Sequence, residues 1–152
     1  MKFAVACDHA GLSLKGEVKD ALEKLGHSVE DLGTKDASSV DYPDFAVAVA
    51  RAVQAGRVER GVLICGTGVG MAMTANKFRG VRAALCTCEF MARMGRAHND
   101  ANVLCLGERV TGPGVARAIA EAFASTAFEG GRHARRVAKI ADAEEAGSGR
   151  GS

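Results

Sequence analysis

Residues 60–70 read RGVLICGTGVG, and this stretch decides the fold class. Its first half, residues 60–65, is a continuous apolar run of the kind that forms buried strands in parallel sheets. Three alternating glycines follow, and beyond them the apolar spacing becomes helical. A buried strand, a tight glycine turn and a helix make up one unit of an α/β fold.

The same alternation of strand and helix extends along the chain in both directions. Short apolar runs predict five strands, at residues 2–7, 27–32, 60–65, 81–85 and 102–106. Apolar residues at helical intervals predict six helices, at residues 12–25, 44–55, 71–77, 89–97, 114–124 and 132–145. We therefore expect a three-layer, Rossmann-like α/β fold, in which a five-stranded parallel sheet carries helices on both faces and a C-terminal helix follows. Among doubly wound sheets, the strand order 2-1-3-4-5 suits five strands.

Length and composition limit what kind of protein this is. The chain has 152 residues, of which 47% are hydrophobic and 25% charged, which predicts one folded domain at residues 1–146 and a flexible tail at residues 147–152. A net charge of +2 argues against nucleic-acid binding, and no apolar run is long enough to span a membrane. The first residues lack a signal-peptide pattern, and the number of cysteines, five, is odd. We therefore expect a reduced, cytoplasmic protein with no disulfide framework.

Topology predicts where a ligand would bind. Ligands of open parallel sheets bind at the carboxyl ends of the strands, at the point where the strand order reverses. In the order 2-1-3-4-5 this point lies between strands 1 and 3. Asp8 and His9 follow strand 1, and Cys65 ends strand 3 immediately before the glycine loop. These polar and reactive side chains predict the site.

The glycine loop and Cys65 each allow a functional and a structural interpretation. Alternating glycines let backbone N–H groups approach an anion, although a tight strand-to-helix turn needs the same residues. The loop lacks the Gly-Lys-Ser/Thr ending of a P-loop, and its glycine spacing is not that of the dinucleotide fingerprint. Cys65 could be a thiolate that acts as base or nucleophile, or it could be a core thiol. A core position is what we expect for the other four cysteines, Cys7, Cys86, Cys88 and Cys105.

Other candidate residues are weaker on spacing alone. Asp8 would suit a phosphoacceptor receiver module, but Cys65 stands where such a module has its phosphorylated Asp. His98 is an acid–base candidate or a surface histidine. Arg132 and Arg136 share one helix face, which suits a phosphate group or simply a solvated surface. Cysteines 86 and 88 have no second pair at zinc spacing, so we expect no metal site.

Several separate strings together resemble one known family, the type B ribose-5-phosphate isomerases, which belong to a group that includes galactose-6-phosphate isomerase subunits. The resemblance covers residues 2 to about 140, and its strings are CDHAGLSLK, DYPDFA, ICGTGVGMAMTANKFRGVRAAL, HNDANVLCLGERV and EGGRHARRV. The family uses either a Cys in the CGTG motif or a Glu in the following helix as base. This chain has Cys65, with Ala75 in that helix, and so resembles the Cys form. The resemblance implies an aldose–ketose isomerase that interconverts D-ribose 5-phosphate and D-ribulose 5-phosphate through a cis-enediolate, in carbohydrate metabolism and the pentose phosphate pathway, with no cofactor or metal.

The resemblance also implies a role for each matching position. Cys65 would move the proton between C2 and C1, Thr67 would help to shift protons between O1 and O2, and His98 would open the furanose ring. Backbone N–H groups of the loop would stabilise the enediolate, namely those of Gly66, Thr67, Gly68, Val69 and Gly70. The remaining substrate-binding positions are Asp8, His9, Asn99, Arg109, Arg132 and Arg136, of which the last two would hold the phosphate.

The expected sheet geometry predicts a site shared between two chains. The helix at 89–97 must start at the carboxyl edge of the sheet and run back, so that His98 lies near the amino edge, roughly 15 Å or more from Cys65. His98 would then serve the Cys65 of a partner in a two-fold homodimer. The family resemblance also points to a dimer, or to a tetramer of paired dimers. Two alternative functions remain open, an isomerase of another sugar phosphate (allose 6-phosphate, galactose 6-phosphate or a tetrose phosphate) and a non-catalytic phosphosugar-binding module.

Overall fold

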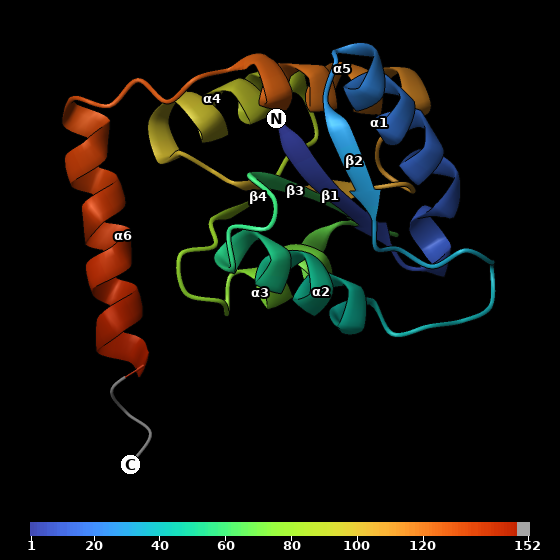
Figure 1. Ribbon diagram of the computed structural model, residues 1–152, viewed down its shortest axis with the longest axis horizontal. Helices are drawn as coiled ribbons and strands as arrows, with labels where there is room; N and C mark the ends of the chain where they lie inside the picture. The colour runs from blue at the N-terminus through green and yellow to red at the C-terminus, as the bar shows by residue number, and fades with distance from the viewer. Residues whose placement is uncertain (149–152) are drawn as a thin grey trace.

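A five-stranded, all-parallel sheet forms the middle layer of the computed structural model, which describes residues 1–148 (Figure 1). Its strands are β1 Lys2–Cys7, β2 Ser28–Asp31, β3 Arg60–Cys65, β4 Ala83–Leu85 and β5 Val103–Gly107. A short 3-10 turn, His9–Gly11, precedes the six helices, which are α1 Leu12–Lys24, α2 Tyr42–Gln54, α3 Val69–Ala75, α4 Glu89–Asn99, α5 Pro113–Ser125 and α6 Arg132–Ser148. The predicted fold class is confirmed, and the element ends differ from the predicted ones by a few residues.

Helices cover both faces of the sheet because side chains alternate along each buried strand. Phe3, Val5 and Cys7 of β1 point into one core with α1, α4 and α5, whereas Ala4 and Ala6 point into a second core with α2 and α3. Figure 1 shows α1, α4 and α5 above the sheet and α2 and α3 below it. The three layers are those that the sequence predicted.

The strand order is 2-1-3-5-4, so the predicted order 2-1-3-4-5 was wrong in its last two positions. β5 pairs with β3 on one side and with β4 on the other. Burial explains why β5 and β4 have swapped places relative to the predicted order. Every residue of β5 is buried, whereas the three residues of β4 are only half-buried. A short, half-buried strand is suited to the edge of a sheet.

α6 stands away from the layered body, at the left of Figure 1. Within residues 1–148 it contacts α4, and near its far end the Gly80 N–H donates to Glu144 Oε2 at 3.0 Å. The helix includes Gly147 and Ser148, the first two residues of the predicted tail, and the rest of that tail lies outside the described residues. None of the helices within residues 1–148 has the length and apolar character needed to cross a membrane.

Candidate active site

The thiol of Cys65 lies at the carboxyl end of β3, where the glycine loop begins. The residue is 5% exposed, and the Gly68 N–H donates a hydrogen bond to its Sγ at 3.1 Å. Gly68 has a φ of +79°, and an added Cβ would lie 2.5 Å from Leu85 Cδ1 and 2.9 Å from the Leu106 carbonyl carbon. Glycine is therefore required at this position, and the turn that it makes aims an N–H at the sulfur. The sulfur therefore has a fixed hydrogen-bond donor at the start of the loop.

The loop itself is open to solvent on its outer side. Thr67 and Val69 are exposed, and the Val69 N–H points back to Thr67 Oγ1 at a long 3.4 Å. Gly66 and Gly70 are half-exposed. The outer side of this loop is therefore accessible to a ligand, whereas Gly68 is buried and its N–H is directed at Cys65.

Arg109 reaches this loop because β5, and not β4, lies beside β3. Cys65 pairs with Gly107, and the Arg109 N–H donates to the Gly66 carbonyl oxygen at 3.0 Å. The Arg109 side chain crosses Gly66, whose added Cβ would lie 3.5 Å from its Cδ, Nε and Cζ atoms. Only the family resemblance had indicated Arg109, and the predicted strand order would have placed it one strand further from Cys65.

Asp8 and His9 leave the end of β1 beside the same loop. Asp8 is 6% exposed, its N–H donates to the Ile64 carbonyl oxygen at 3.2 Å, and its Oδ1 accepts from the Ala10 N–H at 2.9 Å. His9 Nδ1 accepts from the Val40 N–H at 3.2 Å, which fastens the 33–41 loop over this edge. Both residues therefore lie at the predicted edge, and both also have a local structural role.

Sequence reasoning missed Tyr42 as a member of this site. An added Cβ on Gly70 would lie 2.5 Å from the Tyr42 ring, so the ring packs directly on the loop. Tyr42 is 40% exposed. The DYPDFA string drew attention to this segment, but no spacing rule connects Tyr42 to residue 70.

His98 and Asn99 lie elsewhere, at the opposite edge of the sheet. Both belong to the last turn of α4, which extends two residues beyond its predicted end. The chain then enters β5 at Val103, which pairs with Gly61 at the start of β3, four residues from Cys65. Four strand residues span about 13 Å, so one chain does not bring His98 to its own Cys65.

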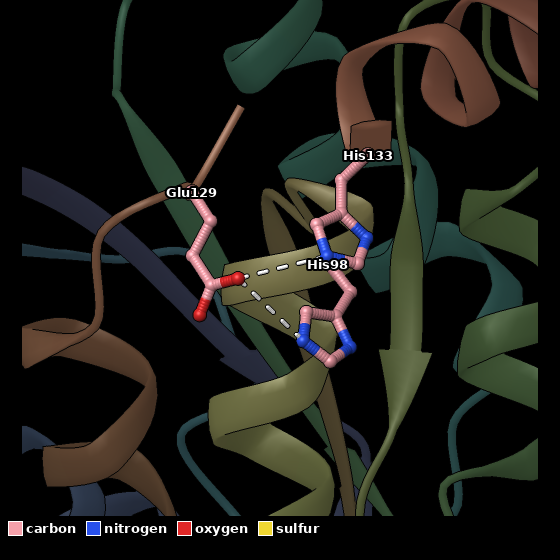
Figure 2. A group of neighbouring side chains, drawn as sticks. All are labelled: His98, Glu129 and His133. Carbon is pink, nitrogen blue, oxygen red and sulfur yellow. Dashed lines mark ion pairs between the residues drawn. The ribbon is translucent and has the colours of Figure 1, made fainter. Parts of the chain in front are cut away.

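A cluster of three titratable side chains surrounds His98, and sequence reasoning missed two of them (Figure 2). The rings of His98 and His133 are stacked, with centroids 4.1 Å apart and planes 4° apart. Glu129 Oε2 lies 3.8 Å from His98 Nε2 and 3.6 Å from His133 Nε2. Burial of the His133 ring, followed by the positive charges of His98 and Arg132, lowers the pKa of His133 below its ordinary value.

Imidazole and carboxylate are also zinc ligands, and these three ligand atoms lie within 4.8 Å of one another. The geometry is poor for a cation, however. Parallel rings direct their nitrogen lone pairs along parallel planes, not toward one point. Arg132 Nε lies 3.5 Å from His133 Nε2 and adds positive charge. These three side chains are therefore better arranged for acid–base chemistry than for binding a metal ion.

Arg132 and Arg136 begin α6 beside this cluster, and both are exposed. Each chain therefore carries two separate groups of candidate residues. One, at the carboxyl edge, contains Cys65, the glycine loop, Asp8, His9 and Arg109. The other, at the amino edge, contains His98, Asn99, Arg132 and Arg136. A groove of about 800 Å³ lies between α6 and the β4 edge, lined by Asn99, Arg82 and Ile140 among others, and it does not contain Cys65.

The other cysteines differ from Cys65 in their environment. Cys7, Cys86 and Cys105 are buried in the two cores, as predicted, and burial raises the pKa of Cys7 to about 11 and that of Cys86 to about 12. Cys88 is half-exposed at the start of α4, so its predicted core position was wrong. All five cysteines are free.

Comparison with known proteins gives matches over nearly the whole chain. The family model described as Ribose/Galactose Isomerase matches residues 3–140. Ribose-5-phosphate isomerase B of Escherichia coli (strain K12) is 46% identical over 144 residues, which are 95% of this chain and 97% of that protein. D-erythrulose-4-phosphate isomerase of Pectobacterium atrosepticum is 40% identical over 141 residues, 92% of this chain and 93% of that protein. A solved structure of ribose-5-phosphate isomerase B from Clostridium thermocellum superposes with a TM-score of 0.94 at 51% identity, covering 96% of this chain and 99% of that one.

Proposed function

Because this chain belongs to the ribose/galactose isomerase family, we propose that it interconverts D-ribose 5-phosphate and D-ribulose 5-phosphate with Cys65 as the base. The observation that carries the proposal is the Cys65 thiol, which accepts an N–H from Gly68 at 3.1 Å below a solvent-open glycine loop. A thiolate held in this way can remove a proton from a carbon that carries a hydroxyl group next to a carbonyl.

The proposed chemistry moves one proton and shifts one double bond. The Cys65 thiolate takes the C2 proton of the open-chain aldose, and the negative charge moves to the carbonyl oxygen of a cis-enediolate. N–H groups of the loop from Gly66 to Gly70 would stabilise the charge of that oxygen, while the Gly68 N–H also holds the Cys65 sulfur. Thr67 shifts the proton between O1 and O2, and the Cys65 thiol returns its proton to C1, which yields the ketose.

The substrate needs groups that hold its two ends. Asp8 and Asn99 would bind sugar hydroxyls, because a carboxylate and an amide both hydrogen-bond hydroxyl groups. His9 and Arg109 lie at the carboxyl edge and would hold the substrate above the loop. Arg132 and Arg136 would bind the phosphate, because two guanidiniums on one helix face match its oxygens.

Completing this site requires a second copy of the chain. His98, Asn99 and the two arginines of α6 lie at the edge opposite to Cys65, so a two-fold homodimer would bring them to the partner's glycine loop. Exposed apolar side chains on α3 and at the start of α4 support such an interface, in particular Met73 at 64% and Phe90 at 66% exposure. Two such dimers could pair into a tetramer.

Subunit exchange tests the shared site. Cys65→Ala and His98→Ala chains should each be inactive in the conversion of ribose 5-phosphate to ribulose 5-phosphate. After mixing and exchange, each heterodimer should contain one complete site, and activity should return. A mixture that stays inactive despite exchange, proven by mass spectrometry, would mean that His98 does not serve a partner's Cys65.

Isomerisation of another sugar phosphate is the less favoured alternative, and it rests on one relative that is named as a D-erythrulose-4-phosphate isomerase. A panel of pentose, hexose and tetrose phosphates, compared by kcat/KM, decides between them. We expect the highest value for ribose 5-phosphate. A higher value for a tetrose or hexose phosphate would overturn that substrate assignment, and binding without any turnover would indicate a non-catalytic phosphosugar-binding module.

Two general properties belong to the same proposal. The activity should need no metal, so incubation with EDTA should leave kcat unchanged. The five free cysteines fit a reducing, cytoplasmic environment, in which a thiolate base stays reduced.

A further inference from the structure

His98, His133 and Glu129 form a cluster at the amino edge of the sheet, and the proton transfer by Cys65 does not involve His133 or Glu129. Glu129 sits in the segment between α5 and α6, and its N–H donates to the Ala97 carbonyl oxygen at 3.0 Å. This bond fixes the segment to the last turn of α4, directly beside His98. The backbone hydrogen bond therefore holds the Glu129 main chain in place, and only the side chain of Glu129 remains free to move.

A pair of glycines then turns the chain back so that His133 lies against His98. Gly130 and Gly131 have φ values of +65° and +53°, a conformation that other residues rarely adopt. The His133 N–H donates to the Gly130 carbonyl oxygen at 2.9 Å, which starts α6. His133 is 5% exposed, whereas the His98 side chain is 36% exposed. The buried ring forms a flat support, and the outer ring is available to a substrate.

The charges around the stack act differently on its two rings. Two imidazolium rings 4.1 Å apart would repel each other, so the stacking disfavours a positive charge on both rings at once. Arg132, and Arg136 one turn further along α6, add positive potential on the His133 side, and burial also disfavours a charge there. Glu129 is the negative group that faces both rings. A charge is therefore disfavoured on the buried ring of His133, and the exposed ring of His98 is the one that can face a substrate.

We propose that Glu129 and His133 are positioning residues that hold His98 as the acid for opening the sugar ring. Glu129 faces Nε2 of His98, which leaves Nδ1 directed away from the carboxylate and available to the substrate (Figure 2). The 3.8 Å separation is longer than a hydrogen bond, and such contacts commonly tighten when substrate binds. The inference rests on the proposed function.

The step balances without any further reactant. The His98 imidazolium gives its Nδ1 proton to the furanose ring oxygen O4 as the C1–O4 bond breaks. The C1 hydroxyl loses its proton to water and becomes the aldehyde carbonyl, and solvent returns one proton to His98. No oxidant or reductant takes part.

Two substrates separate this step from the chemistry of Cys65. Ribose 5-phosphate is mainly a closed furanose in water, whereas ribulose 5-phosphate stays open because its 5-oxygen carries the phosphate. Exchange of the C1 proton of ribulose 5-phosphate with solvent therefore needs enediolate formation but no ring opening. Turnover of ribose 5-phosphate needs both.

The experiment compares these two rates in Glu129→Gln, His133→Ala and His133→Phe chains, with Glu121→Gln on the exposed face of α5 as a matched control. Glu129→Gln and His133→Ala should lower kcat for ribose 5-phosphate by about tenfold, part of the 10²–10⁴ that a positioned acid supplies. C1 exchange should stay within about twofold of the native rate. His133→Phe keeps a flat neutral ring beneath His98 and should restore most of the lost turnover. Glu121→Gln should change neither rate.

Each other outcome contradicts one part of the proposal. If neither rate falls, or if both fall together, Glu129 and His133 do not act through ring opening. If His133→Phe is as slow as His133→Ala, the flat support is not what His133 provides. If the native protein catalyses no C1 exchange at all, the proposed isomerase itself fails, and this inference fails with it.

Discussion

Replacement of Gly68 by alanine tests the loop geometry most sharply, because the structure gives both its cost and its consequence. At a φ of +79° an alanine is strained by about 1–2 kcal/mol relative to glycine. Its Cβ would also lie 2.5 Å from Leu85 Cδ1, which can move, and 2.9 Å from the Leu106 carbonyl carbon, which cannot move without shifting β5. The loop must therefore shift, and the hydrogen bond from the Gly68 N–H to Cys65 Sγ, 3.1 Å in the native chain, is lost.

The size of the effect follows from that hydrogen bond. A hydrogen bond to a charged group contributes about 1.5–3 kcal/mol. If Gly68→Ala removes this bond from the thiolate, kcat should fall roughly 10- to 150-fold. KM should change little, because the phosphate contacts lie on other elements. The assay is steady-state turnover of ribose 5-phosphate, with thermal unfolding followed in parallel.

Two other glycines separate local strain from damage to the loop. Gly56 has a φ of +67° but nothing within 4 Å of an added Cβ, so Gly56→Ala should lower stability by about 1 kcal/mol and leave kcat unchanged. Gly16 lies within α1 with open space around it, so Gly16→Ala should stabilise the fold by about 0.5–1 kcal/mol. A Gly68→Ala chain with kcat within twofold of native would refute the reasoning, as would an equal loss of kcat in Gly56→Ala.

Three further predictions concern reactivity, phosphate binding and acid stability. Iodoacetamide at pH 8 should leave Cys7 unmodified, because burial raises its pKa to about 11 and only about one thiol in a thousand is ionised, whereas alkylation of Cys65 should abolish activity; peptide mass spectrometry reports both. Arg136→Ala should raise KM for ribose 5-phosphate at least about tenfold with little change in kcat, and should not affect an unphosphorylated sugar; equal losses on both sugars would show a structural role. Burial opposes ionisation of Asp31, but the N–H of residue 33 and the Lys15 ammonium at 3.0 Å outweigh it and hold the pKa of that carboxyl below its ordinary value. This stabilisation is present above the unfolded pKa of about 3.9 and is lost as pH falls through the folded value, so Asp31→Asn should flatten the acid side of the stability–pH curve measured by denaturant unfolding.

The fold class could be predicted because each local pattern agreed with it. Continuous apolar strands such as residues 60–65 occur where both faces of a sheet are covered, and the helical spacing between the strands requires parallel crossovers. The order of the strands across the sheet could not be predicted in the same way, because the alternation of strands and helices gives only their order along the chain. The apolar run at 102–106 and the weaker one at 81–85 did contain the signal, since the more apolar strand belongs in the middle.

The candidate site was predictable where residues follow a strand directly. Asp8, His9 and Cys65 lie at the expected edge because parallel strands all end there. Tyr42, Glu129 and His133 were not predictable, because backbone turns and packing bring them to their neighbours and no sequence spacing does so. The most specific signal available was the glycine pair between Glu129 and His133, and its left-handed conformation is visible only in the structure.

The most direct test of the central assignment, Cys65 as the base, is deuterium uptake by substrate carbon in D₂O, followed by NMR. The native protein should incorporate deuterium at C1 of ribulose 5-phosphate, whereas Cys65→Ala should lose at least about 100-fold in that rate, as expected when a general base is removed. The variant should still bind ribose 5-phosphate within a few-fold of native affinity, since its phosphate contacts are intact. Cys65→Ala chains that exchange the C1 proton at the native rate would contradict the account.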